Sequence, residues 1–437
     1  MGRDNKNAYT IRIVFFSLLL DLLSFTMILP LLPALLDHYK ENDGHGLFST
    51  IFQYIKNIQI FLSAPDQVST ILYGGILGSM YSFFQFLCSP IIGALSDVYG
   101  RKYLMLFCLI GIALSHLLWV LSSNFPIFVF ARLIGGISKG NISLSMAIIS
   151  DVTPPKTRGR AMALIGIAFS IGFTLGPMFG AWFSWMSIGS RTKNWYTLPA
   201  SFASVLAFCN LIFFMFSFEE SLPNKHRVKC LSTGLLGALS FVNPKDLFLF
   251  NGVSGLSVHE RKQLQMLGQI YFIYLFIYSG LEFTLTFLTH YYFGFSSMQQ
   301  GYMFLTIGLI MALLQAKWVR NIPLSKTKSI GELGLWLIVP AFVLIGIAPN
   351  ILTLYCGILL FAVSTAIVVT CMNTLVSQVG PENQKGTITG IFRSLGALAR
   401  ACGPIVGSIA FWYIGSKWTY LMAAVALILP PVLLHRI

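Results

Sequence analysis

Long apolar segments alternate with short polar ones along the whole 437-residue chain. A helix needs about 20 apolar residues to cross the hydrocarbon core of a membrane, and most of these segments reach that length. The pattern therefore predicts an all-α membrane protein with twelve transmembrane helices. Their expected ranges are 13–36, 68–95, 103–122, 125–150, 160–187, 197–218, 266–291, 298–320, 331–348, 351–377, 387–413 and 417–434.

Two of the polar segments are long. Residues 37–67 follow the first predicted helix, and their apolar residues recur at helical spacing, which predicts an amphipathic helix on the outer membrane surface. Residues 219–262 are polar and basic, and they separate two sets of six predicted helices. We expect an N-terminal six-helix bundle of residues 1–218, a cytoplasmic linker of residues 219–262 and a C-terminal six-helix bundle of residues 263–437.

Composition and charge agree with this pattern. Hydrophobic residues make up 56% of the chain and charged residues only 10%, and a soluble protein of this composition would leave apolar surface that it cannot bury. The net charge is +14, and most of the 29 Lys and Arg residues lie in segments that the helix pattern assigns to one side of the membrane. Basic segments mark the cytoplasmic side. We therefore predict that both termini are cytoplasmic, and the positive charge does not indicate nucleic-acid binding.

The sequence shows no motif for catalysis or cofactor binding. None of the seven cysteines lies in a segment assigned to the outer side, so no disulfide framework is predicted. There is no phosphate-binding loop of the kind that nucleotide enzymes use, and no group of His and Cys residues has metal-ligand spacing. We expect no enzyme activity, no cofactor and no bound metal.

The two halves share a pattern of glycine and proline. At one constant offset, Gly176-Pro177 in the fifth predicted helix aligns with Gly403-Pro404 in the eleventh. Repeats of this kind occur in transporters that are built from two similar bundles. Small residues also let helices approach closely in a membrane, and we expect a packing role at the interface between the halves. The predicted helix-packing residues are Gly172, Gly176, Pro177, Gly180, Gly403 and Pro404.

A short charged link joins the second and third predicted helices. It contains Gly93, Asp97, Gly100, Arg101 and Lys102. Charged side chains are costly in hydrocarbon, and a basic link lies on the cytoplasmic side. We therefore predict a tight turn at the cytoplasmic face that acts as a conformational gate.

Further residues are predicted to join this gate. Asp151 and Arg158 bracket the link between the fourth and fifth helices, and we expect them to form a charge cluster with Arg101. Asp97 is expected to contact the cytoplasmic end of the eleventh helix, because the free backbone N–H groups at a helix start attract a carboxylate.

Five charged residues lie deep inside predicted helices. The cations are Arg132, Lys139 and Arg400, and the acids are Asp21 and Glu282. Charges at this depth are costly and usually functional, although Asp21 has the alternative role of merely pairing with a buried cation. We expect all five to line a substrate cavity, with Lys139 and Arg400 facing it near mid-depth. The surplus of cations predicts an anionic substrate, and the two acids are the candidate proton carriers.

Several of these motifs resemble the major facilitator superfamily. The charged link is similar to the loop between helices 2 and 3 of that family, and Arg132 with its following glycines is similar to helix 4. Asp21 with Pro30 and Pro33 resembles the first helix of tetracycline exporters. The chain as a whole resembles the tetracycline-transporter-like branch, which is associated with organic anion transport. This resemblance implies two six-helix bundles around a central cavity and transport by alternating access.

These observations lead to one main functional expectation. We expect a secondary active transporter of small organic solutes, above all organic anions, with coupling to protons as an option. Two alternatives stay open: a proton-coupled exporter of cationic or amphiphilic drugs, and a membrane sensor or scaffold on the same fold that does not transport. The expected partners are an organic anion, protons and the lipid bilayer. We expect a monomer in the plasma membrane or an intracellular membrane.

Overall fold

The computed structural model of the protein describes residues 3–42, 46–61, 70–189, 194–223, 227, 242–253, 255–319, 322–381 and 384–437. Within these residues every regular element is a helix, and twelve segments are long and apolar enough to cross a membrane. The predicted all-α fold with twelve transmembrane helices is confirmed.

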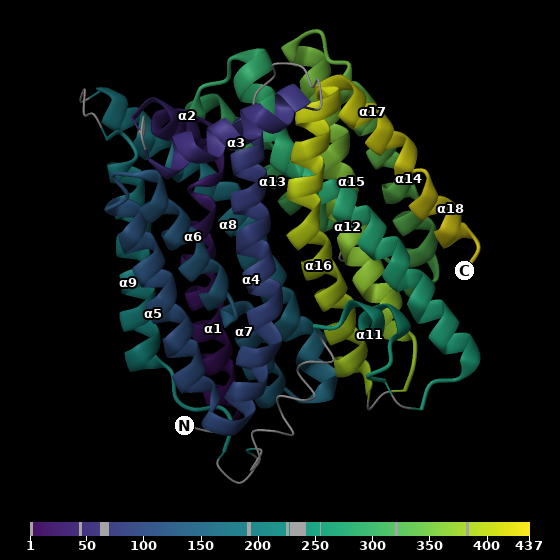
Figure 1. The fold of residues 1–437 in the computed structure, drawn as a ribbon. Coiled ribbons are helices and arrows are strands. Elements are labelled where there is room, and N and C mark those ends of the chain that lie inside the picture. The colour runs from purple at the N-terminus through teal and green to yellow at the C-terminus, as the bar shows by residue number, and fades with distance from the viewer. Residues whose placement is uncertain are drawn as a thin grey trace. The chain divides into compact units, whose positions relative to one another are not determined.

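The helices follow one another as labelled in Figure 1. The first part of the chain forms α1 (Arg3–Thr26), η1 (Leu29–Leu31), α2 (Leu32–Asn42), α3 (Leu47–Phe61), α4 (Thr70–Tyr99), α5 (Arg101–Val120), α6 (Phe125–Ser138), α7 (Asn141–Val152), α8 (Pro155–Gly189) and α9 (Thr197–Ser217). The second part forms α11 (Pro244–Leu249), α12 (Val258–Phe293), α13 (Ser297–Lys317), η4 (Leu324–Lys326), α14 (Thr327–Gly346), α15 (Ile351–Gln378), α16 (Lys385–Ile414), α17 (Ser416–Ala426) and α18 (Leu429–His435).

The chain forms two compact units, each of which is described by itself. Unit 1 contains residues 1–52, 84–239 and 296–305, and unit 2 contains residues 53–83, 240–295 and 306–437. The units follow the two predicted halves, with two exceptions. The second part of α3 and the first part of α4 belong to unit 2, and the first part of α13 belongs to unit 1. Much of the predicted linker lies outside the described residues, and the predicted domain boundaries stay predictions.

Each unit is held by helices that pack along their length. In unit 1, α1 contacts α7, α8 and α9, and buried side chains such as Leu18, Leu22 and Phe214 fill its core. In unit 2, α12 packs along α16 and α14 packs along α15, as Figure 1 also shows. Lipid tails are as apolar as these side chains, so close packing and interhelical hydrogen bonds provide most of the attraction between the helices.

In the part of the chain that the structure describes, three of the predicted transmembrane helices are interrupted. The first breaks between α1 and η1 ahead of Pro30, and the twelfth breaks between α17 and α18 ahead of Pro430. Proline has no N–H group and restricts the residue before it, which explains both breaks. The fourth helix breaks between α6 and α7, where the N–H of Lys139 bonds to the carbonyl of Gly136 only three residues back. No proline marks this third break.

Several helix ends differ from those predicted. The helices α4 and α5 reach Tyr99 and Arg101, so the turn predicted over residues 93–102 is reduced to the single residue Gly100. The helix α12 begins well before the predicted residue 266, because Ser257 and Glu260 form a reciprocal capping box at its start. The helix predicted in residues 37–67 is observed as α3, and its place on the outer surface stays a prediction.

Candidate functional site

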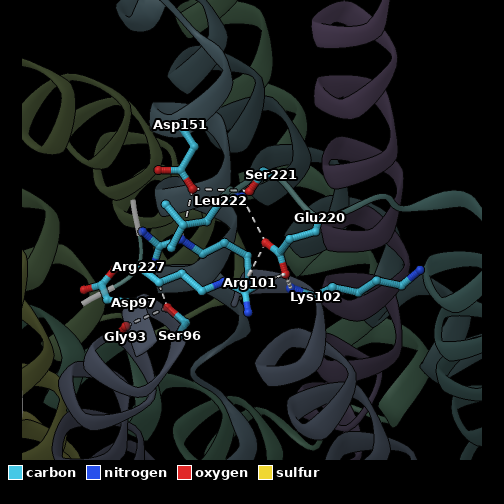
Figure 2. Close-up of polar contacts among 10 residues, drawn as sticks. All are labelled: Gly93, Ser96, Asp97, Arg101, Lys102, Asp151, Glu220, Ser221, Leu222 and Arg227. Atoms are coloured by element: carbon cyan, nitrogen blue, oxygen red, sulfur yellow. Dashed lines mark hydrogen bonds and ion pairs between the residues drawn. The ribbon is translucent and has the colours of Figure 1, made fainter. Parts of the chain in front are cut away.

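A cluster of polar side chains joins the ends of α4, α5 and α7 in unit 1, as Figure 2 shows. Arg101, the first residue of α5, is buried, and its guanidinium contacts two carboxylates. Its Nη1 lies 2.6 Å from Oδ1 of Asp97 on α4, and its Nε lies 3.0 Å from Oδ2 of Asp151 on α7. Nη1 also donates a hydrogen bond to Ser96 Oγ. Charge-assisted bonds of this kind are strong and directional, so one guanidinium ties three helix ends together.

Glu220, which follows α9, caps the start of α5. Its Oε1 accepts a hydrogen bond from the backbone N–H of Arg101 at 3.0 Å, and its Oε2 accepts one from the N–H of Lys102 at 3.1 Å. Arg227 Nη2 lies 3.5 Å from the same Oε2. A helix start has unpaired N–H groups and a positive dipole end, and a carboxylate satisfies both. The charge of Glu220 therefore fixes the end of α9 against the start of α5.

Gly100 makes this close arrangement possible. Its φ of 103° and ψ of 154° belong to a region that only glycine adopts without strain. A methyl group at this position would lie 2.5 Å from Oε2 of Glu220. The one-residue link and the glutamate cap therefore depend on each other.

The structure brings together three of the predicted gate residues: Asp97, Arg101 and Asp151. The side chain of Arg158 lies outside the described residues. Gly93 is inside α4, and a Cβ there would meet no atom within 4 Å, so packing does not explain this glycine. Figure 2 shows the side chain of Lys102 extending away from the cluster. The predicted contact of Asp97 with the eleventh helix stays a prediction.

Sequence reasoning missed Glu220. The chain presents two adjacent acids after α9, and nothing local separates the capping residue from its neighbour Glu219. Glu219 pairs with Lys6 on the surface, where the Oε2–Nζ distance is 2.7 Å and the side chains are 73% and 61% exposed. The hydrogen bond from Lys6 lowers the pKa of Glu219 below its ordinary value. Glu220 caps α5 and Glu219 does not, because the end of α9 lies beside the start of α5. This difference depends on the tertiary structure.

A second polar group is buried deep in unit 1, between α1 and the break in the fourth helix. Asp21 Oδ2 accepts a hydrogen bond from Lys139 Nζ at 2.7 Å and another from Asn141 Nδ2 at 2.8 Å. The side chain of Asp21 has no exposed surface and that of Lys139 is 2% exposed. The pairing of Asp21 with a buried cation, which the sequence left open, is therefore observed. The predicted place of Lys139 on the central cavity stays a prediction.

An aromatic ring and a small cavity lie beside this pair. The ring of Phe25 lies 4.5 Å from Lys139 Nζ and 5.8 Å from the guanidinium carbon of Arg132, so it offers its negative face to both cations. Arg132 also lines a cavity with His116, Ser115 and neighbouring apolar side chains. The cavity volume is about 10 Å³, which is enough for about one water molecule. This part of unit 1 is therefore closely packed around its charges.

Unit 2 contains the other two predicted charges. Glu282 on α12 is half-buried and accepts a hydrogen bond from the hydroxyl of Tyr278 at 3.0 Å. Arg400 lies on the neighbouring helix α16 and is exposed. Among the described residues Arg400 forms no ion pair. The buried ion pair between Lys139 and Asp21 in unit 1 thus has no equivalent at Arg400.

The repeated glycines pack α8 against the end of α1 in unit 1 and α16 against α12 in unit 2. In unit 1, a methyl group on Gly176 of α8 would overlap Oγ1 of Thr26, and one on Gly180 would overlap the carbonyl of Met27. In unit 2, a methyl group on Gly403 of α16 would overlap Ser279 on α12. These contacts lie within each unit. The predicted packing role at the interface between the halves stays a prediction. Of the predicted residues, Pro404 does lie against the other half of the sequence, since a methyl group on Gly75 of α4 would be 3.0 Å from its carbonyl oxygen.

Other residues of the same two helices do contact the opposite half of the sequence. In unit 2, a methyl group on Gly75 of α4 would lie 2.5 Å from Cβ of Ser408 on α16. The N–H of Ile405, which follows Pro404, donates to Ser79 Oγ on α4 at 2.9 Å. In unit 1, a methyl group on Gly301 of α13 would lie 2.6 Å from Cβ of Ala181 on α8. Each unit therefore includes a helix segment from the other half of the chain, held by small residues.

Comparison with known proteins supports this description. The family model of the Major Facilitator Superfamily matches residues 14–404. The human "Major facilitator superfamily domain-containing protein 10" is 41% identical over 98% of this chain and 92% of its own length. The class H tetracycline resistance protein of Pasteurella multocida is 24% identical over 97% of this chain and 94% of its own.

Solved structures give the same result. The crystal structure of the human organic anion transporter MFSD10 (TETRAN) has a TM-score of 0.80 and 40% identity, and the match covers 98% of this chain and 99% of that one. A bacterial homologue of the lysosomal transporter Spinster has a TM-score of 0.66 at 13% identity, with 98% and 96% of the chains covered. The second likeness concerns the fold alone.

Proposed function

Because the chain belongs to the Major Facilitator Superfamily, we propose that it is a secondary active transporter of small organic anions that works by alternating access and couples transport to protons. The human relative whose structure is 40% identical is described as an organic anion transporter. Related tetracycline resistance proteins span most of this chain. Both likenesses support transport of an organic solute, and the charges inside the helices favour an anion.

The main support for an anionic substrate is that Arg400 has no ion-pair partner among the described residues. Inside the predicted membrane helices, the charge of Lys139 is balanced by Asp21 at 2.7 Å, whereas Arg400 forms no ion pair among the described residues. Arg400 is exposed and lies within electrostatic range of Glu282 without forming an ion pair with it, so its guanidinium can make a bidentate, charge-assisted contact with a bound carboxylate. Arg400 is therefore the leading anchor for the substrate. Glu282, on the neighbouring helix α12 of the same unit, belongs to the proposed substrate site with Arg400, and Arg132 stays a predicted cavity residue of unit 1.

The proton carriers in this proposal are the two carboxylates. Asp21 and Glu282 are the acids that lie deep inside the predicted membrane helices, and each accepts a hydrogen bond from another side chain. A carboxylate can bind a proton when its cationic partner leaves. We place the Arg101 cluster on the cytoplasmic side together with both termini, where its ion pairs would form and break as the transporter changes state.

Transport assays on purified protein in proteoliposomes test the proposal. The substrates are 2-naphthoate, the neutral 2-naphthamide and the cationic 2-naphthylmethylammonium, which share one ring system. We expect uptake of the anion above both analogues. Arg400→Ala should lower uptake of 2-naphthoate by about tenfold or more, because a charge-assisted hydrogen bond contributes about 1.5–3 kcal/mol.

The control is Arg436→Ala, which removes an exposed cation near the end of the chain. It should leave uptake unchanged. Preferential uptake of the ammonium compound would favour the exporter of cationic drugs instead. No uptake of any of the three compounds, with protein that is folded, would contradict the proposal.

A further inference from the structure

The small cavity of unit 1 lies where α5 and α6 pack together, near the interruption that follows α1. Residues three and four apart on a helix share a face, and one face of α5 forms most of the wall. The lining residues are Ser115, His116 and Trp119 of α5, Ala131 and Arg132 of α6, and Ile28. The volume of about 10 Å³ is enough for one particle of the size of a water molecule. It is too small for a carboxylate or a sulfate.

Trp119 has a hydrogen-bond donor without a partner. Its side chain is 2% exposed, and its Nε1 atom is buried and makes no hydrogen bond among the described residues. An indole N–H can only donate. A buried donor that stays unsatisfied is costly, so an acceptor in the cavity that Trp119 lines would stabilise the fold.

The polar groups around this donor are also suited to an acceptor. The hydroxyl of Ser115 donates its proton to the carbonyl of Ala131 at 2.7 Å. His116 has one N–H donor in either neutral tautomer, and the guanidinium of Arg132 has several. None of the six lining residues is acidic. The wall of the cavity is therefore rich in donors and contains one full positive charge.

The charges deep in this unit do not cancel. Among the described residues, Arg132 and Lys139 are the cations deep inside its predicted membrane helices, and Asp21 is the acid at that depth. Asp21 is bound to Lys139 at 2.7 Å. Hydrogen bonds to neutral groups leave this count unchanged, and the ring of Phe25, 5.8 Å from the guanidinium carbon of Arg132, compensates only part of a charge. One small anion beside Arg132 would bring the sum to zero.

We propose that this cavity binds one small halide ion, chloride in the cell, between the indole N–H of Trp119 and the guanidinium of Arg132. The ion satisfies the buried donor, balances the charge and joins α5 to α6. It is a structural ion of unit 1 and is separate from the organic substrate, so the inference goes beyond the proposed function. A water molecule would fit the same volume but would leave the positive charge, and the experiments distinguish the two.

Thermal unfolding tests for the ion. The protein is purified without halide, and chloride then replaces gluconate stepwise at constant ionic strength and pH, with unfolding followed by circular dichroism. A ligand that binds only the folded state stabilises it in proportion to the logarithm of its concentration above the Kd. On the scale of domains of 150–250 residues, the midpoint should rise by roughly 3–5 °C for each tenfold rise in chloride. Sulfate should have no such effect.

Two variants assign the effect to the cavity. Trp119→Phe removes the N–H group and keeps an aromatic ring, and Arg132→Gln removes the charge and keeps an N–H donor. Both should abolish the response to chloride. The matched control is Trp185→Phe on α8, whose side chain is 62% exposed, and it should respond like the wild type. Equal midpoints of the wild type in chloride and gluconate would overturn the proposal, as would a response that persists in Trp119→Phe.

A measurement on the wild type decides the question even if neither variant folds. Crystals grown in sodium bromide should give an anomalous difference peak beside Trp119 and Arg132. A water molecule at that place, with no anomalous signal, would overturn the proposal. Sulfate that raises the midpoint as much as chloride would show a general salt effect and would also overturn it. Because none of these measurements uses the substrate, a failure to transport 2-naphthoate would contradict the proposed function alone.

Discussion

The glutamate cap on α5 makes a quantitative prediction, because two adjacent acids with different surroundings provide their own control. Glu220 is 24% exposed and accepts two backbone N–H groups of α5 at 3.0 and 3.1 Å. Hydrogen bonds to a charged group contribute about 1.5–3 kcal/mol each, and partial exposure to water reduces this. The charge–dipole attraction at the helix start adds about 0.3–1 kcal/mol.

Glu220→Ala removes both hydrogen bonds and the charge. We expect it to lower the free energy of unfolding by about 2 kcal/mol, and Glu220→Gln by about half as much, because the amide keeps one acceptor without the charge. On the scale of domains of 150–250 residues, this corresponds to a fall of about 4–8 °C in the unfolding midpoint for the alanine variant. The measurement is thermal unfolding of the purified protein, followed by tryptophan fluorescence at one heating rate, since membrane proteins commonly unfold irreversibly.

Glu219→Ala is the matched control. Glu219 lies on the surface and contacts only the exposed Lys6 among the interactions described, so its removal should leave the midpoint unchanged. Equal shifts of the unfolding midpoint in the two alanine variants would show that stability depends on the negative charge near α9 and not on the cap. An unchanged midpoint for Glu220→Ala would refute the reasoning altogether.

Two further predictions concern the glycines at helix contacts. Gly176→Ala should destabilise the protein by about 1–3 kcal/mol, because the new methyl group would overlap Thr26, whereas Gly166→Ala on the same helix meets no atom within 4 Å and should be harmless in thermal unfolding. Gly75→Ala should lower stability by overlap with Ser408, and adding Ser408→Gly should restore part of the loss. If Gly166→Ala is as damaging as Gly176→Ala, or if Ser408→Gly worsens the Gly75 variant, close packing at these glycines is not the cause.

The sequence was sufficient for the number and order of the transmembrane helices, because the length of an apolar segment is a local property. Interruptions were predictable only where proline causes them, as before Pro30 and Pro430. The break at Lys139 has no such signal. The helix is interrupted at Lys139, whose ammonium group donates a hydrogen bond to Asp21, a residue far away in the sequence. A tertiary contact of this kind cannot be read from local propensity.

The same limit applies to the candidate sites. The sequence singled out Asp97, Arg101 and Asp151, because charges in short links between membrane helices are costly in hydrocarbon. Their ion pairs are observed, and their role as a gate stays a prediction. It did not identify Glu220, since capping depends on where α9 ends relative to α5. It also identified Asp21 and Lys139 as intramembrane charges but did not assign them to each other. Asn141, which supplies the second donor to Asp21, looked like any other polar residue.

The ion pair between Asp21 and Lys139 changes how the surplus of intramembrane cations is interpreted. From the sequence alone, Lys139 and Arg400 are expected to attract a substrate carboxylate equally. In the structure they differ, because Lys139 is already neutralised by Asp21 and Arg400 has no ion-pair partner among the described residues. In the proposed function Arg400 therefore has the leading role in attracting the anion. Lys139 contributes little to the choice of an anion while Asp21 neutralises it, because separating a buried ion pair is costly.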